Sequence, residues 1–188
     1  MRYAIDCGHN CPPDTGCAGI KQEDSLTLAV GSRAMKGLLS LGHEVIDCRP
    51  GKVNTVTQSL GQRCLTANRQ KANIYVSIHF NCFNSKAFGT EVFAISETGK
   101  EVATSVLEKI VALGFANRGV KDGGKFYVLR NTDMPAILIE CCFCDSQKDM
   151  DLFAKVGPDA IANAIVHGLT GIAPLDETNF DPPSIRID

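Results

Sequence analysis

Three short apolar runs, each followed by a side chain that can bind a metal ion, constrain the fold of this chain more than any other feature. The runs and the residues at their ends are 2–8 with His9, 74–78 with His79, and 136–139 with Glu140. Strands buried on both faces of a parallel sheet read as near-continuous apolar runs, and ligands bind at the carboxyl ends of such strands. The sequence therefore predicts a parallel sheet with chemistry along its carboxyl edge.

Amphipathic segments separate these runs. Helical spacing of apolar residues predicts helices over 23–41, 57–72 and 99–113, with further helix starts at Ser146 and Pro158. Additional strands are predicted over 44–48, 89–94 and 126–129. We therefore expect an α/β three-layer domain, in which helices flank a central, mostly parallel (mixed) sheet of about six strands.

The last residues differ in character from the rest of the chain. Residues 174–188 contain Pro182-Pro183, four acidic residues and little helical periodicity. Such a composition is typical of a linker. We expect 1–173 to form the compact domain and 174–188 to be a linker or tail that leads to a further domain.

Composition excludes several classes of function. The chain has 188 residues, 44% of them hydrophobic, which is enough for one domain with a sizeable core. A formal charge of −2 and the lack of basic runs argue against nucleic-acid and membrane-surface partners. No apolar run is long enough to span a bilayer, and the first residues do not form a secretion leader. We expect synthesis in the cytoplasm without a signal peptide.

The nine cysteines do not read as a disulfide framework. Their number is odd and Cys141 and Cys142 are adjacent, so we expect mostly small buried hydrophobes in a reducing compartment. A structural zinc site formed by Cys7, Cys11, Cys141 and Cys144 is an alternative, although the spacing of the first pair fits neither a zinc ribbon nor a zinc finger.

A second carboxylate completes a catalytic constellation. Glu23 begins the first predicted helix, so two histidines and two glutamates can converge. Two histidines and one carboxylate leave one zinc position open for water, and the other carboxylate can act as a base. This combination predicts a metallohydrolase.

Each of these residues also has an ordinary structural explanation. A histidine at the end of a strand can be a hydrogen-bonded core residue, and an acid in the first turn of a helix is favoured by the helix dipole. Glu140 is harder to explain structurally, because a carboxylate after an apolar strand needs a partner. We expect Asp6 to orient a ligand or stabilise the first loop, and His43 and His167 to be structural.

Ordered motifs identify the family that the chain resembles. They are D-x-G-H at 6–9, E-x-x-L-x-L at 23–28, R-x-x-x-A-N at 63–68, S-I-H-x-N at 77–81, G-x-E-V at 89–92 and M-P-A-I-L-I-E at 134–140. Together they resemble the zinc-dependent N-acetylmuramoyl-L-alanine amidases, over Arg2 to about Gly171. The cysteine-rich stretch after Glu140 resembles the catalytic domains of phage or prophage endolysins of Gram-positive bacteria.

The resemblance implies a set of roles. His9, Glu23 and His79 are expected to bind one Zn²⁺ ion, and Glu140 to be the catalytic general base. The implied reaction cleaves the amide bond between the lactyl group of N-acetylmuramic acid and L-alanine of the peptidoglycan stem. For this mechanism we expect Asn81 to help bind the substrate or stabilise the oxyanion.

Two alternatives to this function stay open. One is a zinc peptidase or deacetylase that acts on another amide, and the other is a non-catalytic cell-wall-binding module with a structural metal. In the amidase interpretation the expected partner is peptidoglycan, with neither nucleic acid nor membrane, and a C-terminal cell-wall-binding domain outside this chain is considered as a further partner. Such a protein is made in the cytoplasm and acts on the wall after its release.

Overall fold

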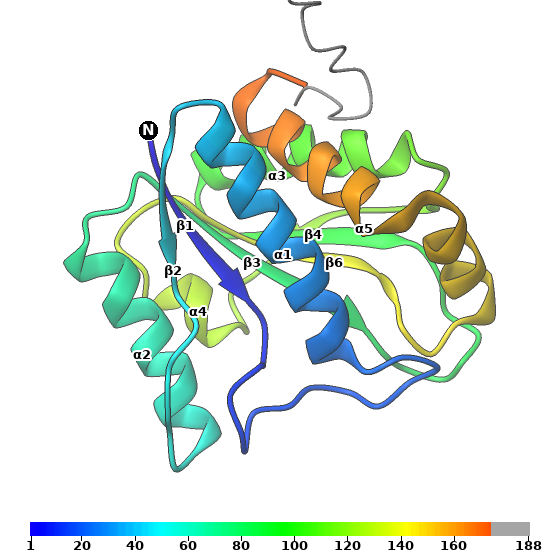
Figure 1. The fold of residues 1–188 in the computed structure, drawn as a ribbon, viewed down its shortest axis with the longest axis horizontal. Coiled ribbons are helices and arrows are strands. Elements are labelled where there is room, and N and C mark those ends of the chain that lie inside the picture. The colour runs from blue at the N-terminus through cyan, green and yellow to red at the C-terminus, as the bar shows by residue number, and fades with distance from the viewer. Residues whose placement is uncertain (174–188) are drawn as a thin grey trace, which may run out of the picture.

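The computed structural model describes residues 1–173, so the tail predicted at 174–188 lies outside the described residues. One mixed sheet has the strand order β2-β1-β3-β6-β4-β5 (Figure 1). Its strands are β1 (Arg2–Cys7), β2 (Glu44–Asp47), β3 (Ile74–Asn81), β4 (Thr90–Ala94), β5 (Asn117–Asp122) and β6 (Ala136–Phe143). Neighbouring strands are parallel except β4 and β6, which are antiparallel.

Helices cover both faces of the sheet. They are α1 (Glu23–Ser40), α2 (Val56–Arg69), α3 (Glu97–Val111), α4 (Tyr127–Arg130) and α5 (Gln147–Thr170). One core cluster joins α1, α3 and α5 to the sheet, and a second joins α2 and α4 to the opposite face (Figure 1). The predicted three-layer α/β class is thereby confirmed.

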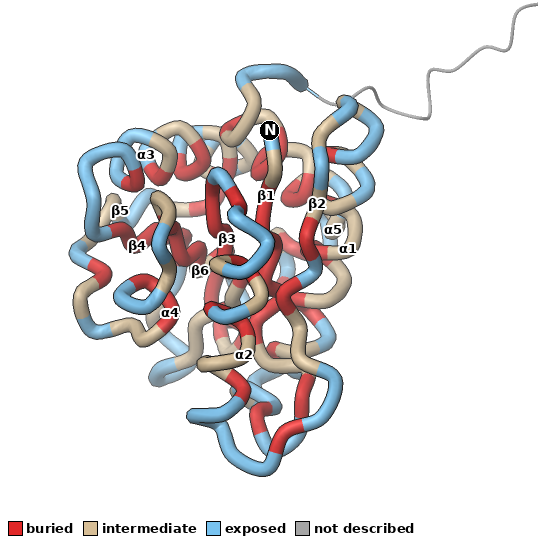
Figure 2. The backbone as a smooth tube through the Cα atoms, turned by 90° about the vertical axis from the view of Figure 1, so that its left-hand side faces the viewer, coloured by how far each residue is buried: buried red, intermediate tan, exposed pale blue. Residues whose placement is uncertain are grey.

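Burial on both faces explains the apolar runs in the sequence. In β1, Tyr3 and Ile5 pack into the first cluster while Ala4, between them, packs into the second. Alternate residues of a strand point to opposite faces, so a strand covered on both sides needs apolar residues at consecutive positions. Figure 2 shows the buried strands enclosed by more exposed helices and loops.

One predicted strand was wrong, and one strand of the sheet was missed. Residues 126–129 do not form a strand: most of this run belongs to the short helix α4, whose Val128 and Leu129 are buried in the second cluster. Periodicity cannot distinguish helix from strand in so short an apolar run. The sheet instead gains β5, a polar edge strand whose residues are all intermediate or exposed and which therefore lacks an apolar pattern.

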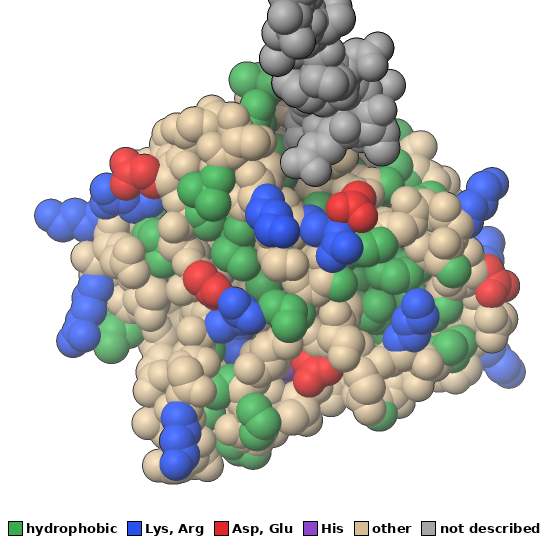
Figure 3. All heavy atoms as spheres, viewed as in Figure 1, with side chains coloured by type: hydrophobic (Ala, Val, Ile, Leu, Met, Phe, Trp, Pro, Cys, Tyr) green, Lys and Arg blue, Asp and Glu red, His purple; other side chains and the backbone are tan. Residues whose placement is uncertain are grey.

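The last helix joins two predicted helix starts. Ser146 caps α5 through its side chain, and the helix bends at Gly157, whose φ of 78° is not helical, before Pro158 begins the second half. Proline suits the first turn of a helix because it lacks an N–H. No helix within residues 1–173 is long and apolar enough to cross a membrane. On the face seen in Figure 3, basic and acidic side chains are interspersed.

Candidate metal centre

Three predicted ligands converge beside the strand ends. His9 follows β1, Glu23 opens α1 and His79 lies in β3, and their ligand atoms all lie within 4.8 Å of one another. Glu23 Oε1 is 3.1 Å from His9 Nε2 and 3.2 Å from His79 Nδ1. Two imidazole nitrogens and a carboxylate at this spacing fit around one Zn²⁺ ion with bonds of about 2.0–2.2 Å.

In the turn after β1, the His79 ring lies close to the backbone of Gly8. A Cβ added to Gly8 would lie 2.4 Å from His79 Cε1, so a larger residue would displace the ring. His9 and Asn10 then adopt positive φ values of 62° and 58°. Asn10 stabilises this turn by donating hydrogen bonds to Gly8 O and Thr27 Oγ1, both at 2.8 Å. The glycine of the D-x-G-H motif therefore makes room for the second histidine.

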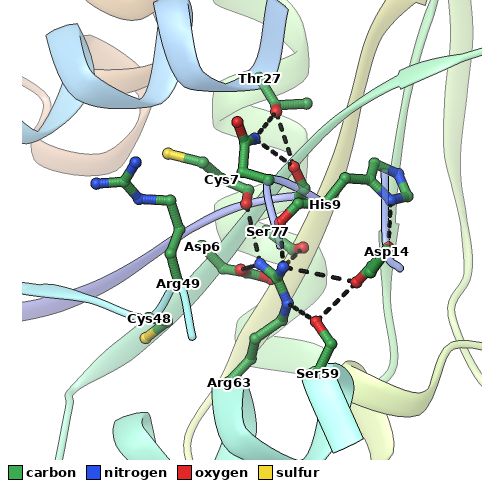
Figure 4. Close-up of polar contacts among 12 residues, drawn as sticks. Asp6, Cys7, His9, Asp14, Thr27, Cys48, Arg49, Ser59, Arg63 and Ser77 are labelled. Atoms are coloured by element: carbon green, nitrogen blue, oxygen red, sulfur yellow. Dashed lines mark hydrogen bonds and ion pairs between the residues drawn. The ribbon is translucent and has the colours of Figure 1, made fainter. Parts of the chain in front are cut away.

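A buried hydrogen-bond network holds His9 at Nδ1, the ring nitrogen that does not face Glu23 (Figure 4). Asp14 Oδ1 lies 2.6 Å from His9 Nδ1, and Asp14 Oδ2 accepts a 2.7 Å hydrogen bond from Ser59. Ser59 accepts in turn from Arg63 Nε at 3.1 Å. Because Nδ1 is occupied by Asp14, Nε2 of His9 faces Glu23 and is the nitrogen free for a metal.

Arg63 connects this network to Asp6. Its guanidinium, 1% exposed, pairs with Asp6 and donates to the backbone oxygens of Cys7 and His9. Asp6 also accepts from Tyr75 at 2.5 Å and Ser77 at 2.8 Å. As expected from the sequence, Asp6 stabilises the first loop. The roles of Asp14 and Ser59 were missed, because their link spans 45 residues and neither stands in a motif.

Opposing effects set the ionisation of the candidate ligands. Burial favours the neutral form of His9, but hydrogen bonds with Asp14 and Glu23 outweigh it and raise the pKa of His9 to about 9. Burial likewise opposes ionisation of Glu23, yet hydrogen bonds with His79 and His9 hold its pKa below the usual value. Glu23 is therefore anionic at neutral pH.

Glu140 lies opposite His79 in the register of β6 and β3. Both strands continue beyond these residues, so the two side chains lie within the strands and not after them as the apolar runs indicated. With the three ligands, Glu140 lines a cavity of about 530 Å³. Its Oε2 is buried without a hydrogen-bond partner in the described part of the chain. Burial, followed by the charges of Glu23 and Glu91, raises the pKa of Glu140 well above its usual value.

Asn81 stands in the wall of the same cavity. Its amide already donates to Glu91 Oε1 at 3.0 Å, and its carbonyl oxygen accepts from the Cys82 N–H at 2.9 Å. Glu91 is held in turn by Arg118 and Lys121. The side chain of Asn81 is therefore fixed in one orientation, with one amide hydrogen left for a ligand.

The cysteines differ from the sequence prediction. Seven of the nine are free and buried, as expected, whereas Cys17 and Cys82 are joined in a disulfide and so depart from the expected reduced state. The four cysteines considered for a structural zinc site do not come together. Within residues 1–173, Cys144 instead groups with Cys17 and Cys82.

Known proteins share this fold and part of the sequence. The catalytic domain of the CD27L endolysin, which targets Clostridia difficile, superposes with a TM-score of 0.82 at 25% identity, over 91% of this chain and 97% of that domain. The catalytic domain of CwlV, the N-acetylmuramoyl-L-alanine amidase from Bacillus (Paenibacillus) polymyxa, gives 0.80 at 30% identity over the same shares. The endolysin of Bacillus phage SPP1 is 32% identical over 174 residues, 87% of this chain and 61% of its own length.

A match to a family model shows to which family the chain belongs. A metal-ligand triad beside a buried carboxylate, in a cavity at the edge of an α/β sheet, is a site typical of metal-dependent hydrolases. The model described as N-acetylmuramoyl-L-alanine amidase matches residues 4–171, and the chain belongs to this family. It spans about half the length of the first curated relatives, 51% and 56% of two uncharacterised Clostridium perfringens proteins.

Proposed function

We propose that this chain is a zinc-dependent peptidoglycan amidase. In this proposal it hydrolyses the bond between the lactyl group of N-acetylmuramic acid and L-alanine of the stem peptide. The observation that carries the proposal is the meeting of His9, Glu23 and His79 beside the unpartnered carboxylate of Glu140, in one cavity of an amidase-family fold.

The ligand set is proposed from its donor atoms. His9 through Nε2, His79 through Nδ1 and Glu23 through its carboxylate would hold the ion, since these atoms face one another. A bound Zn²⁺ ion would supply Lewis acidity toward the amide carbonyl and a water of lowered pKa. Asp14 would keep His9 in the tautomer that presents Nε2 to the cavity.

Glu140 is proposed as the group that moves the proton. Its raised pKa gives its carboxylate a high affinity for a proton, so it is suited to accept one from the attacking water. The same carboxyl group then donates this proton to the nitrogen of the departing L-alanine. Within residues 1–173, Oε2 has no hydrogen-bond partner, which supports this role because no hydrogen bond from those residues has to break first.

Substrate binding is assigned to the cavity wall. Asn81 is held by Glu91 and has a remaining amide N–H to donate to the muramoyl group or to the developing oxyanion. In this proposal the enzyme is made in the cytoplasm and reaches the wall after release. Because its formal charge is −2, the chain gains no electrostatic attraction to anionic wall polymers, and we expect wall affinity to come from a separate binding domain.

Digestion of purified cell walls tests the function. We expect the protein to release the amino group of L-alanine without creating new reducing sugar, and a chelator to stop this release. New amino termini on other residues would identify a peptidase, and free acetate would identify a deacetylase. Wall binding without cleavage of any bond would identify a binding module and contradict the proposal.

A further inference from the structure

Three cysteine sulfurs converge beside the metal centre. Cys17 lies in the loop before α1, Cys82 directly follows β3 and Cys144 directly follows β6, yet their Sγ atoms all lie within 4.8 Å of one another. Cys17 and Cys82 also line the cavity that holds the candidate ligands, whereas Cys144 is fully buried. The proposed function uses none of the three.

The backbone holds these cysteines in place independently of any bond between their sulfurs. Cys144 N donates to Asn81 O and Cys144 O accepts from Ile20 N, both at 2.8 Å. Cys17 O accepts from Glu23 N at 3.0 Å. None of these hydrogen bonds involves a sulfur atom, so reduction of the disulfide does not itself break them.

A disulfide accounts for only two of the sulfurs. Cys17 and Cys82 form one, which leaves the Cys144 thiol beside them without a covalent partner. Three thiolates around one Zn²⁺ ion, each bonded at about 2.3 Å, stand roughly 3.8 Å apart, which is compatible with the observed grouping. Sulfur ligands select thiophilic ions such as Zn²⁺, and the cavity side of the group leaves room for a fourth ligand from solvent.

We propose that Cys17, Cys82 and Cys144 in their thiol form bind a second, thiophilic metal ion, and that the Cys17–Cys82 disulfide is the form that excludes it. Binding converts the thiols to thiolates and releases their protons to solvent. Oxidation transfers two electrons from Cys17 and Cys82 to a low-molecular-weight disulfide. That compound is reduced to two thiols and takes up the two protons that the cysteines lose.

Two hydrogen bonds between Cys17 and Glu23 connect the second site to the first. The backbone N–H of Cys17 donates to Glu23 Oε2 at 2.9 Å. An ion bound by Cys17 would therefore hold in place the loop that orients a ligand of the catalytic centre. The two sites remain chemically distinct, since one offers three sulfurs and the other two nitrogens and a carboxylate.

The test measures metal binding in the absence of the catalytic centre. A His79→Ala variant of the full chain is reduced, freed of metal and titrated with Co²⁺ without oxygen. We expect one equivalent to bind with the intense absorption of a thiolate-to-cobalt charge transfer. Cys144→Ser in the same background should remove this absorption. Cys64→Ser, a matched change of a buried cysteine outside the group, should leave it intact.

Two results would overturn the proposal. One is a reduced protein without charge-transfer absorption, and the other is unchanged absorption in the Cys144→Ser variant. Oxidation with glutathione disulfide should abolish metal binding. If the absorption persisted after oxidation, the disulfide would not exclude the ion and the proposal would fail. If His79→Ala does not fold, zinc analysis of reduced wild type decides, with two equivalents expected and one after Cys144→Ser. Since no readout is hydrolysis, failure here leaves the amidase proposal untouched.

Discussion

Two buried carboxylates on the same sheet have opposite surroundings. Asp6 in β1 accepts hydrogen bonds from Tyr75 and Ser77 and pairs with the Arg63 guanidinium. Glu140 in β6 has no partner at Oε2 in the described residues, and burial together with the charges of Glu23 and Glu91 disfavours its ionised form. The first carboxylate is compensated and the second is not.

This difference distinguishes a carboxylate that stabilises the fold from one that can take part in the reaction. A buried charge that is fully hydrogen-bonded and paired stays ionised and holds its neighbours in place. A buried carboxylate without partners is costly for the fold, and its raised pKa gives it a high affinity for a proton. We therefore expect changes at Asp6 and Arg63 to act on stability, and changes at Glu140 to act on the reaction.

The largest effect is expected at Glu140. Glu140→Gln keeps the shape of the side chain but cannot accept a proton, so the rate of muropeptide hydrolysis should fall by about 10²–10⁴. Zinc content and melting temperature should not fall, because an uncompensated acid is lost. Metal analysis, calorimetry and a hydrolysis assay measure this, with the exposed Glu101→Gln as control. Near-normal turnover would remove Glu140 from the mechanism.

The three proposed zinc ligands are expected to differ from Glu140 in their effect on zinc content. His9→Ala, Glu23→Ala and His79→Ala should each lower zinc content and activity together, since a three-ligand site tolerates few losses. If Glu140→Gln lost zinc while Glu23→Ala kept it, the roles of the two glutamates would be exchanged.

The Arg63→Met variant tests the carboxylate that has partners, Asp6. It leaves the charge of Asp6 buried without its counter-ion, which should lower the free energy of unfolding by about 3–5 kcal/mol. Denaturant unfolding measures this loss, and Arg69→Met, an exposed site on the same helix, serves as control. Adding Asp6→Asn to Arg63→Met should restore part of the stability. An Arg63→Met protein as stable as wild type would show that the ion pair contributes little.

Asp14→Asn should have a smaller effect, which is on the affinity for zinc. The neutral amide in this variant cannot provide the charge that orients and polarises His9, so zinc affinity should weaken by about 10–100-fold. Competition with a chromogenic chelator measures the affinity. Hydrolysis at saturating zinc should recover most of its rate, whereas an unchanged affinity would limit Asp14 to a packing role.

The smallest effect concerns Glu91, which is buried but paired with Lys121 and Arg118. Burial opposes its ionisation, but hydrogen bonds from these two residues outweigh it and lower its pKa. Its contribution to stability is thus present above the unfolded pKa of about 4.3, and is lost as pH falls through the lower folded value. Glu91→Gln should flatten this acid loss in urea unfolding between about pH 5 and 3. An unchanged pH profile would contradict the shift.

The sequence by itself determined the fold class and the main candidates for chemistry. Strands buried on both faces need consecutive apolar residues, so β1, β3 and β6 could be recognised without a structure. His9 and His79 stood out because each interrupts or ends such a run. Where a segment lacked this signal the prediction failed, as for the polar edge strand β5 and the short helix α4.

Only the tertiary structure decided how the site is supported. Asp14 meets Ser59 across a separation of 45 residues, Arg63 joins them from the same helix as Ser59, and no local pattern records such a contact. Cys17, Cys82 and Cys144 likewise come from separate segments of the chain. Local propensity and apolar periodicity act over a few residues, whereas partners of buried polar groups are chosen by which segments the folded sheet brings side by side.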